Sequence, residues 1–502
     1  MPNVTFIGKS TIDVSRGITV LQAARAAGLA VESPCNGVGQ CGKCRGRVSG
    51  NSLENVKSPP NAALSDEQRA DGWVLTCEAS IIGDIEVFLP DGEREGTLKI
   101  LEKGLGFEAK LNPGVRKEYD ASRDVTLVFG HRSPDSRASA PSAVGPEALL
   151  CEEAGDTSRL AYGLSLDIGT TTLALSLVDL NTGSELDSVS AMNPQAVYAQ
   201  DVLSRIKFAS EPEGLETLRG ALMEGLGGMI SQITDRCEVP KEHIYEIVCS
   251  GNTCMLHLAV GVNPESLGRY PYTPLIEGAK LLRAPELGIA GVAECALAYL
   301  PPGISAYVGA DITSGILAAL LFERKGVTLF MDIGTNGEMV VASDGRLRAV
   351  STAAGPAFEG MNITMGMRAE KGAVERFEIA DGRISLDTIG GAAPVGVCGS
   401  GLIDIVGELA SNGVLGSNGR FVNSDSGKPP RFLTDRITEY NGKPAFRVSG
   451  DVILAQKDVR QVQLAKGALR AGLEYLLRAI DMTPSDVDEV LIAGSFGYHL
   501  RA

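Results

Sequence analysis

Long apolar stretches are missing from this chain of 502 residues. The best candidate, residues 312–322, falls short of the ~18 apolar residues that a membrane span needs, and small or polar residues interrupt it. The first residues also lack the basic and then apolar pattern of a secretory signal peptide. We therefore expect a cytoplasmic protein that does not cross a membrane.

Basic residues are outnumbered, since 46 Lys and Arg face 62 Asp and Glu and give a net charge of -16. A strongly acidic protein is a poor partner for nucleic acids and anionic membranes, so we expect neither. Histidine is scarce too, with four residues against ten cysteines. In a chain long enough for about three domains, clustered cysteines suggest metal binding rather than a secreted disulfide scaffold.

Four cysteines form a pattern typical of an iron–sulfur site. Cys35, Cys41 and Cys44 have the spacing C-x5-C-x2-C in a glycine-rich segment, and Cys77 follows from a remote segment. Four thiolates can converge on two irons in such a loop. Cysteines without a metal do not usually cluster so closely, and zinc usually takes paired C-x2-C units, so these remain the weaker interpretations.

Residues 1–93 are predicted to form one small domain around this pattern. Alternating residues predict strands over 3–7 and 11–15, an Ala-rich segment predicts a helix over 20–27, and a closing strand is expected over 84–89. Strand, strand, helix and strand is the order of a β-grasp fold. The six remaining cysteines are predicted to pack as small apolar residues, with a second redox site at Cys249 and Cys254 as the alternative. The six are Cys151, Cys237, Cys249, Cys254, Cys295 and Cys398.

A short internal repeat indicates a nucleotide site. DIGTTT (167–172) and DIGTNG (332–337) each follow an apolar strand and precede another. An Asp at a strand end can hold Mg2+, a Gly lets the turn approach phosphates, and Thr hydroxyls and backbone amides bind the phosphate oxygens. A third segment, AGSFGYH (493–499), follows an apolar strand over 490–492 and suits contact with adenosine.

Residues 94–160 separate the two patterns and are predicted to be a linker and a shortened middle region. A strand is expected over 125–129, whereas the Ser- and Pro-rich stretch 131–145 lacks an apolar period. From residue 162 onward, strands and helices alternate as in α/β domains.

The cysteine spacing resembles that of adrenodoxin-type [2Fe–2S] ferredoxins. The three loops, in this order, resemble those of acetate and sugar kinases, heat-shock chaperone ATPases and actin. Their fusion in one chain resembles the reductive activators of corrinoid proteins, over about 1–93 and 162–502. The fold class that this implies is multidomain α/β and α+β, with a β-grasp [2Fe–2S] ferredoxin domain followed by a duplicated actin/sugar-kinase-like ATPase domain. The resemblance also covers stretches 193–206, 250–268, 308–321, 351–369, 396–409 and 455–474.

The resemblance implies a role for each matching residue. The cluster ligands are Cys35, Cys41, Cys44 and Cys77. Asp167 and Asp332 are the catalytic residues, which flank Mg2+ and orient the attacking water. The ATP phosphates are contacted by Gly169, Thr170, Thr171, Gly334, Thr335 and Asn336, and the adenosine by Gly494 and Ser495. Glu338 either extends the second loop or is an ordinary strand residue.

The function implied is ATP-dependent reductive activation of a corrinoid protein of a methyltransferase system. One electron passes from the [2Fe–2S] cluster to Co(II) and gives Co(I). A ferredoxin or flavoprotein supplies the electron to the cluster. A homodimer is compatible with the resemblance. Two departures are expected: 94–160 is short for the middle domain of such proteins, and the ATPase domain, 161–502, stops before its usual end.

Three other functions compete. A ferredoxin-type carrier whose second domain only senses nucleotide would reduce cobalt without ATP. An activator of 2-hydroxyacyl-CoA dehydratases would hold a [4Fe–4S] cluster at a dimer interface and lack an attached ferredoxin, which the first 93 residues argue against. A small-molecule kinase would leave the ferredoxin without a task.

Overall fold

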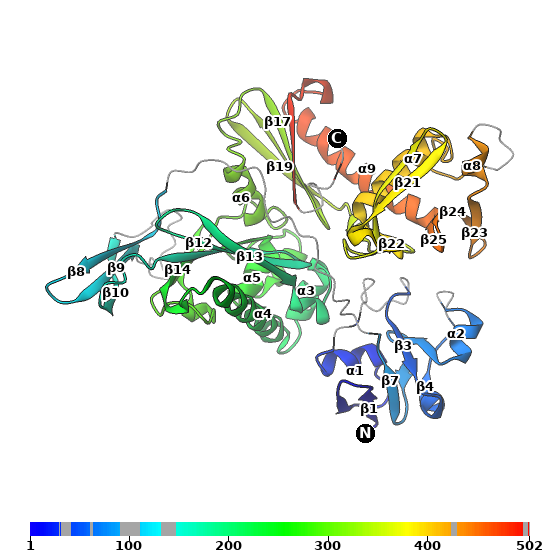
Figure 1. Cartoon of the computed structure of the whole chain (residues 1–502), viewed down its shortest axis with the longest axis horizontal. Helices are drawn as coiled ribbons and strands as arrows, with labels where there is room; N and C mark the ends of the chain where they lie inside the picture. The colour runs from blue at the N-terminus through cyan, green and yellow to red at the C-terminus, as the bar shows by residue number, and fades with distance from the viewer. Residues whose placement is uncertain are drawn as a thin grey trace. The chain divides into compact units, whose positions relative to one another are not determined.

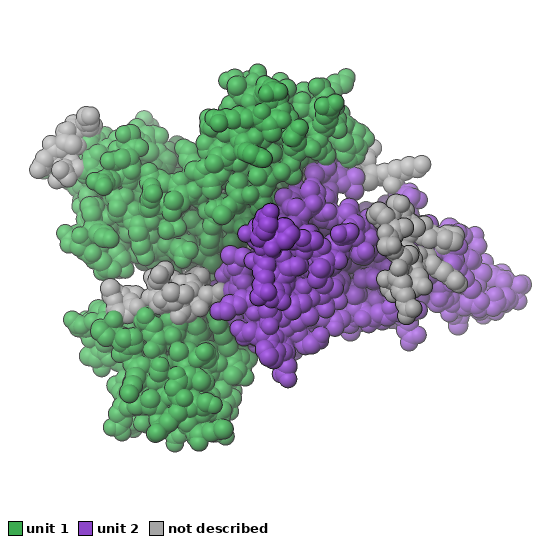
Figure 2. Space-filling view, turned by 180° about the vertical axis from the view of Figure 1, so that it is seen from behind, with its two compact units in different colours: residues 1–101, 321–502 green, residues 102–320 purple. Residues whose placement is uncertain are grey.

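The computed structural model describes residues 1–29, 31, 42–60, 64–90, 111–131, 147–422, 429–494 and 500. The chain divides into two compact units, one made of residues 1–101 and 321–502 and the other of residues 102–320 (Figure 2). We describe the N-terminal domain, the first lobe (within 102–320) and the second lobe (within 321–502) in turn. None of the helices in these described ranges is long and apolar enough to cross a membrane.

The N-terminal domain is built on a five-stranded sheet with the order β2-β1-β7-β3-β5 (Figure 1). Its first strand alternates between exposed and buried side chains, and Val4 and Phe6 enter the core. β1 pairs antiparallel with β2 and parallel with β7, so the β-grasp prediction is confirmed. The elements are β1 (Asn3–Phe6), β2 (Thr11–Asp13), α1 (Val20–Ala26), β3 (Arg45–Val48), β4 (Val56–Lys57), α2 (Asp66–Ala70), β5 (Trp73–Leu75), β6 (Ser80–Ile81) and β7 (Ile85–Phe88).

Helix α1 starts and ends as its sequence predicts. The Thr19 hydroxyl accepts from the Gln22 amide, and the Gln22 side chain accepts from the Thr19 amide, so a capping box satisfies two free donors. Gly28, with a φ of 70°, supplies the left-handed residue after the last turn. The buried face of α1 carries Val20, Leu21, Ala23 and Ala24.

The first lobe contains a six-stranded sheet with the order β13-β12-β11-β14-β16-β15. One face of the long helix α4 is buried along Leu218, Leu222 and Leu226, at the four-residue spacing of a helical stripe. The strands are β11 (Tyr162–Ile168), β12 (Thr172–Asp179), β13 (Glu185–Met192), β14 (Ile244–Gly251), β15 (Lys280–Arg283) and β16 (Leu297–Leu300), and the helices are α3 (Val202–Ala209), α4 (Gly214–Cys237), α5 (Thr253–Ala259) and α6 (Ala310–Ala318).

A second, three-stranded sheet occupies part of the predicted linker. Its strands are β8 (Val115–Asp120), β9 (Val125–His131) and β10 (Glu147–Ala154), in the order β10-β9-β8. The strand expected over 125–129 is confirmed, and β8 and β10 add more regular structure than the composition indicated. Most of the Ser- and Pro-rich stretch lies outside the described residues. The domain boundaries at 93 and 160 stay a prediction.

Polar contacts fasten this small sheet to the first lobe. The Glu246 carboxylate accepts from the Val115 amide at 2.5 Å, and the buried ammonium of Lys117 donates to the Tyr245 hydroxyl at 2.7 Å and to Glu153 at 2.8 Å. A disulfide joins Cys151 of β10 to Cys295. The prediction that the six remaining cysteines pack as small apolar residues is therefore wrong for this pair, because the fold brings together two cysteines that are 144 positions apart in the sequence.

The second lobe has a four-stranded sheet with the order β19-β18-β17-β26, against which helix α9 packs. Two three-stranded sheets, β21-β20-β22 and β23-β24-β25, complete it. The elements are β17 (Val327–Ile333), β18 (Gly337–Ser343), β19 (Arg346–Thr352), β20 (Ala373–Ala380), β21 (Arg383–Thr388), β22 (Gly396–Val397), α7 (Gly399–Ser411), α8 (Arg431–Thr434), β23 (Ile437–Tyr440), β24 (Lys443–Ser449), β25 (Val452–Ala455), α9 (Gln456–Arg478) and β26 (Glu489–Ala493).

The two lobes repeat one strand arrangement, which confirms the predicted duplication. In the first lobe β11 pairs antiparallel with β12 and parallel with β14, and in the second lobe β17 pairs in the same way with β18 and β26. The register is also repeated, because Asp167 lies opposite Ser250 and Asp332 lies opposite Ala493. Gly251 is therefore the counterpart of Gly494, and both have positive φ.

Candidate functional site

Two of the four predicted cluster ligands are described, and the structure brings them together. Cys44 directly precedes β3 and Cys77 lies two residues after β5, and these strands pair antiparallel. Thr76 fixes the two segments, because its amide and its hydroxyl both donate to the Cys44 carbonyl, at 2.7 and 3.0 Å. The two Sγ atoms are 3.1 Å apart. Cys35 and Cys41 lie outside the described residues.

The environment of this pair suits thiolate ligands. Both sulfurs are buried in a small cluster with Leu21, Leu64 and Leu75. The hydrogen bond with Cys77 lowers the pKa of Cys44 to about 6, against the opposing effect of burial. A thiolate is the form that binds iron. Within the described ranges, no group of three or more His, Cys, Asp or Glu side chains could hold a metal ion, so the pair needs further ligands from elsewhere.

The first phosphate loop connects β11 and β12. Asp167 is the sixth residue of β11, and Gly169, Thr170 and Thr171 form the turn that follows. A Cβ on Gly169 would lie 2.5 Å from the Thr172 carbonyl oxygen, so only glycine fits this tight turn. The loop is held from outside as well, since Asn193 donates to the Gly169 carbonyl at 2.8 Å.

Asn252 sets the direction of the Thr170 hydroxyl. Its Nδ2 donates to Thr170 Oγ1 at 2.9 Å, so the hydroxyl hydrogen is left to donate to another acceptor. Asn252 also caps α5, because its Oδ1 accepts from the Met255 amide. The sequence pattern did not single out Asn193 or Asn252, although both lie within stretches that carry the resemblance.

The alternative redox site, Cys249 and Cys254, lies on either side of Asn252. These residues flank the end of β14 and the start of α5, and both are buried. Burial raises the pKa of each thiol to about 12. Buried thiols of this kind are inert, and the segment between them belongs to the first phosphate loop's surroundings. Cys398 is also buried, as predicted, and Cys237 is half-buried.

A fully buried arginine lies behind the first loop. The Arg205 guanidinium donates to the carbonyls of Thr170 and Ala199, to Gln195 Oε1 at 3.0 Å and to the Met255 sulfur. These four partners are neutral, and burial lowers the pKa of Arg205 to about 10. The side chain therefore remains a cation next to the loop, where it favours a bound anion.

Replacing Arg205 with methionine is expected to destabilise the protein and to weaken nucleotide binding. The carbonyl of Thr170, the carbonyl of Ala199 and Gln195 Oε1 would each lose a donor, at about 1–3 kcal/mol apiece for buried acceptors. Urea unfolding and ATP titration would measure the two effects. Lys207→Met is the control, because this exposed residue lies on the same helix and carries the same charge. Equal stability of the two variants would contradict the role of Arg205.

The second phosphate loop connects β17 and β18. The Gly334 amide donates to the Asn336 carbonyl at 3.0 Å and closes the turn. The Thr335 hydroxyl donates to the Glu359 carboxylate, a partner that the sequence pattern did not reveal. Because its hydrogen is engaged, Thr335 can offer an anion its backbone amide rather than its hydroxyl. Among the described residues, a Cβ on Gly334 would have no neighbour nearer than 4.0 Å, so they leave this side of the turn open.

Asp332 and Gly494 lie together in the second lobe. Burial raises the pKa of the Asp332 carboxyl group. A Cβ on Gly494 would lie 2.7 Å from Asp332 Oδ1, and Gly494 has a φ of 83°. The predicted adenosine loop therefore starts beside the predicted catalytic carboxylate. Ser495 lies outside the described residues, and Glu338 accepts from Ser351 across β18 and β19, as an ordinary strand residue does.

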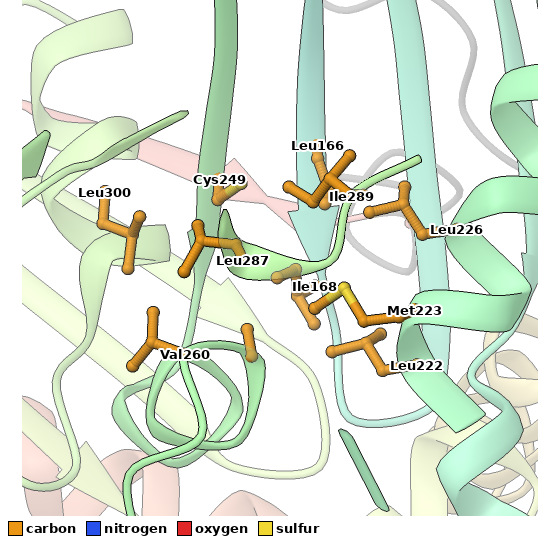
Figure 3. Close-up of a pocket in the computed structure, with 11 residues that line it drawn as sticks. Leu166, Ile168, Leu222, Met223, Leu226, Cys249, Val260, Leu287, Ile289 and Leu300 are labelled. Carbon is orange, nitrogen blue, oxygen red and sulfur yellow. The ribbon is translucent and has the colours of Figure 1, made fainter. Parts of the chain in front are cut away.

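The apolar core of the first lobe contains a gap between its sheet and helix α4. Figure 3 shows side chains from β11, α4 and β14 around it, among them Leu166, Leu222 and Cys249. All of its lining residues are apolar, and Cys249, which belongs to the alternative redox site, is the one candidate residue among them. It therefore offers nothing to hold a charged or polar ligand.

Three family profiles match the chain. Residues 4–81 match the "2Fe-2S iron-sulfur cluster binding domain", residues 162–324 the "RACo middle region" and residues 326–502 the "C-terminal domain of RACo the ASKHA domain". These three ranges correspond in turn to the N-terminal domain, the first lobe and the second lobe. The description "middle region" thus falls on the first lobe, and the shortened middle region over 94–160 stays a prediction.

Relatives match over most of the chain. The corrinoid activation enzyme RamQ of Eubacterium limosum is 30% identical over 97% of this chain and 85% of its own length. The "[Co(II) methylated amine-specific corrinoid protein] reductase" of Methanosarcina barkeri is 24% identical over 68% of this chain and 64% of its own length. The solved structure of a reductive activator for a corrinoid, iron–sulfur protein superposes with a TM-score of 0.66, at 30% identity, over 99% of this chain and 86% of its own.

Proposed function

We propose, from the premise that this chain belongs to the RACo family of reductive activators of corrinoid proteins, that it transfers one electron to the Co(II) of a partner corrinoid protein and uses ATP to do so. The observation that carries the proposal is the combination, in one chain, of the buried Cys44 and Cys77 pair with two matching Asp-Ile-Gly-Thr turns. An electron carrier needs only the first, and a kinase needs only the second. The partner belongs to a methyltransferase system.

A [2Fe–2S] cluster held by Cys35, Cys41, Cys44 and Cys77 would supply single electrons. Cys44 and Cys77 fit this group, because their sulfurs are buried and close together and the pKa of Cys44 is lowered toward the thiolate form. The short Thr76 contacts keep the two ligand segments in register whether the cluster is oxidised or reduced. A ferredoxin or flavoprotein would reduce the oxidised cluster again. The homodimer stays a prediction.

ATP would bind to the two phosphate loops, with Mg2+. In the first loop, Thr170 presents its hydroxyl hydrogen and the amides around Gly169 face the phosphates. In the second loop, the open side of Gly334 admits a phosphate, and Thr335 contributes its amide. We assign to Asp167 and Asp332 the binding of Mg2+ and the orientation of the attacking water, and to Gly494 and Ser495 the contact with adenosine.

ATP has a thermodynamic task in this reaction. Reduction of Co(II) to Co(I) is uphill from a [2Fe–2S] donor, and each ~59 mV of a one-electron gap is a factor of ten in the equilibrium constant. Closure of the lobes on ATP, followed by hydrolysis, would change the complex so that the electron can pass. The protein therefore couples ATP hydrolysis to a change in its partner's cobalt rather than to phosphorylation.

Spectroscopy with a Co(II) corrinoid protein tests the proposal. The reduced chain is expected to give a [2Fe–2S] electron paramagnetic resonance (EPR) signal, and Co(I) absorbance is expected to appear only when ATP and Mg2+ are added. A non-hydrolysable ATP analogue is the matched control. Equal Co(I) yields with and without ATP would establish the carrier alternative instead. Absence of the EPR signal, or of any ATP hydrolysis stimulated by the corrinoid protein, would contradict the proposal.

A further inference from the structure

Arg25 occupies an unusual place in the N-terminal domain. It lies on α1 one helical turn after Leu21, so the two side chains share a face of the helix. Leu21 packs in the buried cluster that contains Cys44 and Cys77, and its amide donates to the Thr76 carbonyl at 2.9 Å. The guanidinium of Arg25 therefore extends from the helix beside the segment that carries Cys77.

Two of the N–H groups of Arg25 are buried without an acceptor. Nε and Nη2 are covered from solvent, and in the described part of the domain they have no hydrogen-bond acceptor and no carboxylate that forms an ion pair with this arginine. Burial lowers the pKa of Arg25, and the opposing electrostatic effects of Cys44 and then Cys77 raise it. Burying such donors unpaired costs several kcal/mol, so an acceptor is expected where they point.

We propose that Arg25 donates hydrogen bonds to the sulfur atoms of the [2Fe–2S] centre at Cys44 and Cys77 and thereby raises its reduction potential. The inference rests on the proposed cluster, and it adds a positioning residue that the cysteine pattern does not predict. A planar guanidinium offers several donors in fixed directions and stays charged at any working pH. Hydrogen bonds to the sulfurs and nearby positive charge both favour the reduced form, which carries one more negative charge.

This role affects both ends of the electron's path. A raised potential makes the centre easier for an upstream donor to reduce. It also widens the uphill gap to Co(II), which is the step that ATP is proposed to drive. Arg25 would thus make reduction of the centre by the upstream donor more favourable and increase the free energy that ATP must supply for the reduction of Co(II).

The midpoint potential of the full-length, cluster-loaded protein tests the proposal. Arg25→Met keeps the apolar stem and removes the charge and the donors, and we expect its reduction equilibrium to fall about tenfold, which is 59 mV for one electron. Arg25→Lys keeps the charge but not the fork, and an intermediate potential is expected. Arg47→Met is the matched control, because it removes one charge from the same domain at a half-exposed side chain paired with Asp71, and no shift is expected. An unchanged potential in Arg25→Met at full cluster occupancy would overturn the proposal.

Pulsed EPR on the wild-type chain supplies a test that needs no change at Arg25. In protein labelled with 15N in the arginine guanidinium groups only, the reduced centre is expected to show a 15N hyperfine coupling that is unchanged in Arg47→Met and that loses the Arg25 contribution in Arg25→Lys. If Arg25→Met does not assemble its cluster, this measurement decides. Absence of the coupling in the wild type refutes the hydrogen bond. A wild type without any [2Fe–2S] signal would instead refute the proposed function.

Discussion

Alanine in place of Cys77 is expected to abolish Co(II) reduction while ATP hydrolysis continues. The Sγ atom of Cys77 lies 3.1 Å from that of Cys44, and the paired strands β3 and β5 lead to these two residues, so the loss of Cys77 removes one quarter of the proposed ligand set and the anchor to β5. A [2Fe–2S] centre needs four ligands, and three thiolates leave one iron open. The EPR signal of the reduced protein should fall to background.

Cys237→Ala is the matched control for this experiment. Cys237 ends helix α4 in the other unit, is half-buried and has no role in either proposed site. Its variant should keep the full EPR signal and the full rate of cobalt reduction. If Cys77→Ala kept an intact [2Fe–2S] spectrum, the ligand assignment would be wrong. If it lost ATP hydrolysis as well, the two activities would not be separable in the way that two modules imply.

Local patterns predicted most of the fold because each was independently strong. The DIGT turns follow apolar strands, and the structure places both at the ends of such strands, in the same register. Thr19 and Gln22 set the start of α1, and Gly28 sets its end. These signals depend on residues within a few positions of one another, which is why they can be interpreted without tertiary contacts.

The missed features depend on contacts between remote segments. Asn193, Arg205 and Asn252 hold the first phosphate loop from three different elements, and no spacing rule connects them with Gly169 or Thr170. Glu359 reaches Thr335 in the same indirect way. The Cys151 and Cys295 disulfide was missed because the two are separated by 144 positions. Arg25 was missed because an arginine on a helix is usually a solvated side chain, and only its burial distinguishes it.

Alanine at Gly334 is expected to weaken ATP binding at least tenfold without destabilising the protein. Among the described residues, the nearest atom to a Cβ at this position is the Asn336 carbonyl oxygen at 4.0 Å, and the φ of Gly334 lies outside the range that strains other residues. Replacing such a glycine usually leaves stability unchanged or raises it by about 0.4–1 kcal/mol. Any loss of affinity must then come from the ligand, because a methyl group would occupy the place where a phosphate approaches the backbone.

Gly494→Ala provides the contrast that makes this result informative. There the new Cβ would lie 2.7 Å from Asp332 Oδ1 on a backbone with φ of 83°, so the protein itself is strained, by about 1–3 kcal/mol, and the carboxylate is displaced. This variant should lose both stability and ATP hydrolysis, as urea unfolding and phosphate release would show. If Gly334→Ala bound ATP as the wild type does, the open side of the second loop would not face the nucleotide. If Gly334→Ala lost stability as Gly494→Ala does, the protein atoms around Gly334 would pack more tightly than the 4.0 Å distance indicates. Weak binding with unchanged stability is the one combination that locates a phosphate beside Gly334, because the described residues place no atom nearer than 4.0 Å to the added methyl group.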